Sequence, residues 1–210
     1  PVAKGHNRFL WDMRMDQISP DVKGVYVWGN YNGYAVKPGK YKAKIETKLG
    51  NAETEITVLA NPSIQATEAE WNEQQSFLKT IVSNIGEIHK TVNEIRRVKK
   101  QLQNQTEILK EKNGAEKVLT EAKNLLKSIE GWESNVVESR IQNGQDVINW
   151  PSKINSEFFN IKVLADAPDP RITQGLKNRL ADLQTEWTTH KKNLESIKKA
   201  ILDYNQLYKS

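Results

Sequence analysis

Apolar side chains recur every three or four residues from about residue 67 to residue 208, and this pattern constrains the fold most. In its first stretch two heptad positions are apolar, the first at Trp71, Leu78, Ile85 and Val92, and the second at Ile81, Ile88, Ile95, Leu102 and Leu109. A helix with such a stripe must bury it against other helices. The sequence therefore predicts long helices packed side by side.

Local signals divide this region into four helices. Thr67 and Glu70 form a capping-box pattern at the start of the first helix, and Asn113-Gly114 should end it. A second helix follows to about Val136, and Pro151 and Asp169-Pro170 are expected to begin the third and fourth. A dimeric coiled coil is the alternative, but three further stripes in the same chain favour an antiparallel intramolecular bundle.

In residues 1–62 the apolar residues recur with a different period. Apolar and charged residues alternate after the Pro38-Gly39 turn and again after Gly50-Asn51, which predicts a β-hairpin. Residues 7–13 are expected to add another strand. The predicted fold class is therefore segregated α+β, with a small Ig-like β-sandwich piece followed by an antiparallel long-helix bundle. We expect an N-terminally truncated Ig-like module at 1–62 and a bundle of about four helices at 63–210.

The composition and the absence of motifs argue against several classes of function. The chain has a net charge of +5, contains no cysteine, and has no run of 18 apolar residues that would span a membrane. The lysines between residues 37 and 48 alternate along one strand, so we interpret them as a solvated strand face rather than a nucleic-acid site. No motif for a catalytic, metal-binding or cofactor-binding site is present, so we expect no catalytic residues, no metal and no cofactor.

His190 falls inside the apolar stripe of the last helix. A polar residue at such a position can fix the register of a bundle. We therefore expect His190 to face the other helices as a hydrogen-bonded structural histidine with a lowered pKa, rather than to belong to a site.

Aromatic and amide side chains crowd one loop-like stretch and form the candidate carbohydrate contact. Its members are Tyr26, Trp28, Asn30, Tyr31, Asn32 and Tyr34. Sugar rings stack on exposed aromatic faces, and amides can bond to sugar hydroxyls. The alternative is that the rings pack against the helices, and exposure of the rings in a row distinguishes the two.

A resemblance adds to this interpretation. The first motif consists of Gly5, Asn7, Phe9, Trp11, Asp12 and Arg14, the second of Pro38, Gly39 and Tyr41, and the third of Asn149, Trp150 and Pro151. Together they resemble the C-terminal region, an Ig-like strand module plus helical tail, of bacterial BNR-repeat, sortilin-like β-propeller proteins, often labelled glycosyl hydrolases. The chain departs from that pattern at residues 60–63, where Ala-Asn-Pro-Ser replaces the common Asp-Pro-Arg.

The resemblance implies a non-catalytic accessory or interaction module at the C-terminus of a larger exported β-propeller protein. Its partners would be the propeller domain of the parent chain and a further protein or glycan, and its location periplasmic or extracellular. The alternative function is a carbohydrate-binding accessory domain of a glycan-acting enzyme.

Overall fold

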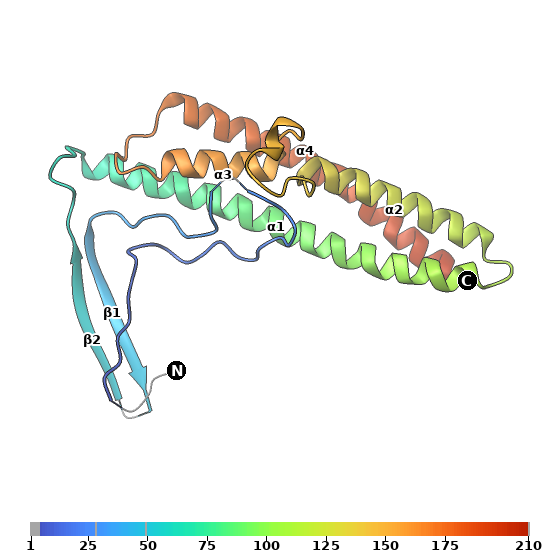
Figure 1. Ribbon diagram of the computed structural model, residues 1–210, viewed down its shortest axis with the longest axis horizontal. Helices are drawn as coiled ribbons and strands as arrows, with labels where there is room; N and C mark the ends of the chain where they lie inside the picture. The colour runs from blue at the N-terminus through green and yellow to red at the C-terminus, as the bar shows by residue number, and fades with distance from the viewer. Residues whose placement is uncertain (1–4, 28, 49, 210) are drawn as a thin grey trace.

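A computed structural model shows a two-stranded antiparallel sheet followed by four α-helices (Figure 1) and describes residues 5–27, 29–48 and 50–209. The strands are β1 (Gly39–Thr47) and β2 (Gly50–Val58). The helices are α1 (Glu68–Lys110), α2 (Glu116–Val136), α3 (Ile154–Ala165) and α4 (Gln174–Lys209). The predicted α+β class and its segregation along the chain are confirmed.

The sheet is a single hairpin in the described part of the chain, so it does not form an Ig-like sandwich. Tyr41 lies opposite Ile56 and Lys42 opposite Glu55, in the register that the alternating pattern predicts. Residues 7–13, expected as a strand, form no ladder, and Met13 has a φ of +58° that a strand does not allow. The pairing nearest to them is an isolated bridge between Arg14 and Ala35, beside which the Val36 amide donates to the Met13 carbonyl oxygen.

The first helix begins where its capping box predicts. The Glu70 amide donates to Thr67 Oγ1 at 3.2 Å, and the Thr67 amide donates to Glu70 Oε2 at 2.7 Å. Gly114, with φ of +79°, follows its C-terminal end and allows the chain to turn into α2. The predicted apolar stripe is buried from Leu78 onward.

Thr67→Ala is expected to lower the free energy of unfolding by about 1 kcal/mol, because an orphan amide of the first turn loses its acceptor. Urea unfolding at pH 7 measures this. Thr185→Ala, an exposed threonine inside α4 whose hydroxyl bonds to Ala181 O, should be nearly neutral. An equal loss in both variants would contradict a capping role for Thr67.

The helices form a bundle in which α2 and α3 each pack against a different part of α1. In Figure 1, α3 lies along the N-terminal half of α1 and α2 along its C-terminal half, while α4 runs past both. Two predicted starts are wrong, since α3 begins three residues after Pro151 and α4 four residues after Pro170. Thr173 Oγ1 accepts from the Leu176 amide, and this signal marks the true start of α4.

The stretch between the extended N-terminal segment and the hairpin packs on the bundle. Its buried side chains are Ile18, Val22, Val25, Val27 and Tyr34, and they belong to the same core as the helices. The predicted boundary at residue 62 does separate strands from helices. Residues 18–34, however, contribute to the core of the bundle. None of the helices in the described residues is both long and apolar enough to cross a membrane.

Candidate interaction surface

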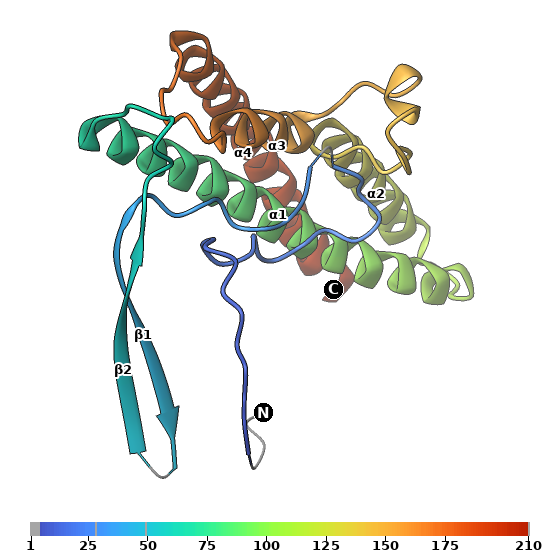
Figure 2. The ribbon, with the colours of Figure 1, turned by 60° about the vertical axis from the view of Figure 1, so that its left-hand side comes forward.

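The hairpin projects from the bundle as an arm, which we define as residues 39–58 (Figure 2). Tyr41, Ala43 and Ile45 of β1 share one face with Ile56 of β2. Ile45 is 52% exposed and Ile56 is 37% exposed, so this face is open to solvent along much of its length. An isolated two-stranded hairpin is marginally stable. An exposed apolar face on such an arm is typical of a surface that binds a partner.

The opposite face of the arm is a ladder of charges. Lys40 pairs with Glu55 at 2.9 Å and Lys42 with Glu53 at 3.0 Å, and all four side chains are largely exposed. This confirms the predicted solvated face for Lys40, Lys42 and Lys44, whereas Lys37 precedes the strand and donates to Asn72 of α1. In these two pairs the lysine lies on β1 and the glutamate on β2, whereas Lys44 pairs with Glu46 of its own strand.

The N-terminal segment lies beside this arm. The ring of Trp11 packs against that of Tyr41, with centroids 5.3 Å apart, and its indole N–H donates to the Arg14 carbonyl. Phe9 is 70% exposed and Leu10 is 83% exposed. The exposed apolar surface of the arm therefore continues onto residues 9–11.

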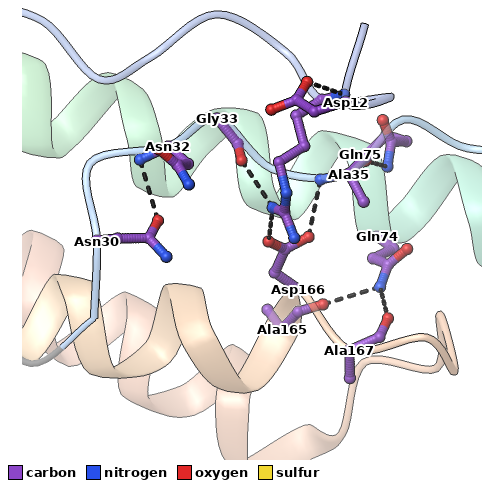
Figure 3. A network of polar contacts seen from close by, with 11 residues as sticks. Asp12, Asn30, Asn32, Gly33, Ala35, Gln74, Gln75, Ala165, Asp166 and Ala167 are labelled. Atoms are coloured by element: carbon purple, nitrogen blue, oxygen red, sulfur yellow. Dashed lines mark hydrogen bonds and ion pairs between the residues drawn. The ribbon is translucent and has the colours of Figure 1, made fainter. Parts of the chain in front are cut away.

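One of the contacts that attach the base of the arm to the bundle is a carboxylate (Figure 3). Asp166, just after α3, accepts from Arg14 Nη1 at 2.7 Å and from the Ala35 amide at 2.9 Å. Arg14 Nη1 also donates to the Gly33 carbonyl at 2.8 Å. Asp166 thus links the N-terminal segment at Arg14 to the segment at Ala35 that leads into β1.

A second cation lies close to this anchor. Lys162, one turn before Asp166, is 3% exposed. Burial lowers the pKa of its amine, while the Asp166 carboxylate acts in the opposite direction. From the facing helix, Gln74 Nε2 donates to the carbonyl oxygens of Ala165 and Ala167, each at 2.8 Å, and Gln75 Nε2 donates to that of Ala35.

The six predicted carbohydrate residues do not present one exposed row. Tyr34 is 6% exposed, and Tyr31 packs edge-on against Phe159 with centroids 5.1 Å apart. Tyr26 is half-buried, Asn30 is exposed and Asn32 is half-buried, with the Asn32 amide donating to Asn30 Oδ1. Trp28 lies outside the described residues. The rings of Tyr31 and Tyr34 therefore serve packing.

The histidine inside the bundle is His89, which sequence reasoning did not select. Its ring is fully buried in α1, and Nδ1 lies 2.7 Å from the Pro20 carbonyl oxygen and Nε2 2.7 Å from Asn155 Oδ1. Burial is the largest influence and lowers the pKa of His89. A neutral ring donates one proton, and Nδ1 must donate it because its partner is a carbonyl oxygen. Nε2 then accepts, so Asn155 satisfies it best with the amide nitrogen rather than Oδ1 turned toward the ring.

His190 does not take that role. Its side chain is 14% exposed, and Nε2 lies 3.7 Å from Glu186 Oε1, one turn earlier on the same helix. Its main-chain carbonyl, in contrast, accepts from Trp132 Nε1 of α2 at 2.9 Å. At this level the link across the bundle comes from the backbone of residue 190, so the predicted role of the imidazole in fixing register is wrong.

No family model, curated protein or solved structure matches the chain. The resemblance to sortilin-like propeller proteins therefore stays a prediction. Among the described residues, no three His, Asp or Glu side chains gather as metal ligands. The arm, with its exposed apolar face and its anchored base, remains the best candidate for an interaction surface.

Proposed function

We propose that this chain is a non-catalytic accessory module of a larger exported protein, whose helical bundle is a base for the β1–β2 arm. The arm docks on a β-rich neighbour, the β-propeller domain of the same protein. The observation that carries the proposal is the projecting hairpin with an uncovered apolar face and two outer edges that have no partner strand in the described part of the chain. A partner strand added at an edge would extend the hairpin toward the Ig-like sheet that the sequence predicts.

The charge pattern disfavours a second copy as the partner. In an antiparallel β1–β1 pair whose two-fold axis passes near residue 42, Lys42 would lie opposite the same residue of the other copy and Lys40 opposite Lys44. Pairing β2 against β2 would set Glu53 and Glu55 against glutamates. Like charges directly opposite each other destabilise a ladder. Such charges disfavour symmetric self-pairing and favour a strand of complementary charge as the partner.

Hydrogen–deuterium exchange tests the docking. In the longer protein, the amides of residues 39–58 should exchange at least tenfold more slowly than in the isolated chain, while buried amides of α1 keep their rates. Ile45→Asp should remove this protection, because it places a charge on the docking face at a site that is exposed in the isolated chain. Ile108→Asp, equally exposed on α1, is the matched control. Equal rates in the two proteins would contradict the proposal, as would turnover of a glycoside by the isolated chain.

The alternative is a carbohydrate-binding accessory domain. The remaining surface candidates are Asn30 and the half-buried Tyr26 and Asn32. Titration of neutral oligosaccharides separates the two functions. Binding that Asn30→Ala abolishes, with the exchange of the arm unchanged, would favour the carbohydrate function over docking.

A further inference from the structure

Residues 20–23 cross α1 and are held there by three side chains of that helix. His89 Nδ1 lies 2.7 Å from the Pro20 carbonyl oxygen, Asn93 Nδ2 donates to that of Asp21 at 2.7 Å, and Arg96 Nη1 donates to that of Lys23 at 2.5 Å. The spacing 89, 93 and 96 places these side chains on one face of the helix. Because Val22 is also buried, the crossing segment is fixed on the helix at both its backbone and its side chains.

A depression of about 740 Å³ opens where this segment meets the helix. Five cations line it, namely Lys23, Lys90, Arg96, Arg97 and Lys100. Its single carboxylate is that of Asp21. Residues 90, 93, 97 and 100 fall within about a third of the helix circumference at 3.6 residues per turn. The depression therefore concentrates positive charge contributed by two separate segments of the chain.

Most of this charge is unbalanced. Arg96 is the exception, because its Nε lies 2.6 Å from Glu133 Oε1. In the described residues, no carboxylate lies within 4.0 Å of the charged groups of Lys23, Lys90, Arg97 or Lys100. The lysines of β1, in contrast, are each paired with a glutamate. A concave surface with several unpaired cations attracts an anion more strongly than scattered surface charges do.

We propose that this basic depression binds a phosphate or sulfate group. Arg97 offers a planar fork of N–H donors that suits such an oxyanion, and the lysines add point charges around it. None of the residues lining the depression is aromatic, so it has no platform on which nucleic-acid bases could stack. A sugar that carries phosphate or sulfate, or the free ion, fits the chemistry better than a nucleic acid.

Calorimetric titration at pH 7 and low salt tests the proposal with three probes: inorganic phosphate, a heparin-derived tetrasaccharide and a single-stranded DNA oligomer. We expect phosphate to bind, and to compete with the tetrasaccharide if the natural source is a sugar. Lys90→Gln/Lys100→Gln should weaken binding at least tenfold. Asp21→Asn should tighten it, because the one carboxylate at the depression is removed. Added salt should weaken binding through screening.

The control removes the same charge elsewhere. Lys192→Gln/Lys199→Gln alters two exposed lysines on α4 and leaves the net charge equal to that of the test variant. Binding in this control should match the unmodified chain. Equal weakening in both double variants would show a general effect of net charge and would overturn the site. Failure of phosphate and the tetrasaccharide to bind, or tighter binding of DNA at equal ionic strength, would overturn it as well.

Discussion

Replacing His89 by alanine is expected to lower the free energy of unfolding by about 4 kcal/mol at pH 7. The substitution removes a fully buried ring and leaves a cavity in its place. It also removes the partner of the Pro20 carbonyl oxygen and of the Asn155 side chain, and each buried polar group left unpaired is costly. Urea unfolding followed by circular dichroism measures the loss. His6→Ala, an exposed position, should cost less than about 0.5 kcal/mol.

The stability conferred by His89 should also depend on pH, with a definite sign. Burial lowers its pKa in the folded chain, although its hydrogen bonds and the charge of Asp21 act in the opposite direction. An unfolded histidine titrates near pKa 6.5. Below that pH the unfolded chain takes up a proton that the folded chain does not. The contribution of His89 to the free energy of unfolding should therefore be fully present above about pH 6.5 and fall as the pH drops toward the folded pKa.

Urea midpoints between pH 5 and 7.5 test this dependence. The slope should reach at most about 1.4 kcal/mol per pH unit for a single group. His89→Gln should flatten the profile, because glutamine does not titrate, whereas His6→Gln should keep it. If the His89→Gln and unmodified profiles ran in parallel, a buried neutral imidazole at position 89 would be ruled out.

The contrast between His89 and His190 shows what a stripe can predict. The heptad pattern identifies which helix face is buried, and the residues from Leu78 to Leu109 confirm it. It does not indicate how wide the buried arc is, because this depends on the number of neighbours. The N-terminal half of α1 contacts α3, α4 and the segment around Pro20, so its arc widens to include His89. His190 lies within its stripe but at the rim of the bundle.

The β region could be predicted only in part for a related reason. Turn residues and alternation define the hairpin locally, and the register of β1 with β2 follows from them. Where the hairpin points depends on long-range contacts such as that between Arg14 and Asp166, which are 152 residues apart in sequence. No local pattern encodes such a contact. The basic depression depends in the same way on residues 20–23 crossing a helix that begins at Glu68.

The anchor at the base of the arm gives the second large effect. Asp166→Asn is expected to lower the free energy of unfolding by about 3 kcal/mol, because it leaves the Arg14 guanidinium without a counter-ion beside the buried Lys162. Breaking a fully buried pair costs about 3–5 kcal/mol. Arg14 is partly exposed, which places the expectation at the lower end of that range. Asp182→Asn, an exposed carboxylate on α4, should be nearly neutral in the same urea titration.

The effect on stability should be local as well as global, because Asp166 joins Arg14 of the N-terminal segment to Ala35, which precedes β1. The Met15 amide donates to the Tyr34 carbonyl at 2.9 Å and the Val36 amide to that of Met13 at 3.0 Å, both next to the Arg14–Ala35 bridge. Asp166→Asn should speed deuterium exchange at these amides more than at Ile88 in the core. In a double-mutant cycle, Arg14→Gln should add little to Asp166→Asn, because the first change has already removed their interaction. Strictly additive losses would show that Arg14 and Asp166 act independently, and another contact would then have to hold the arm in place.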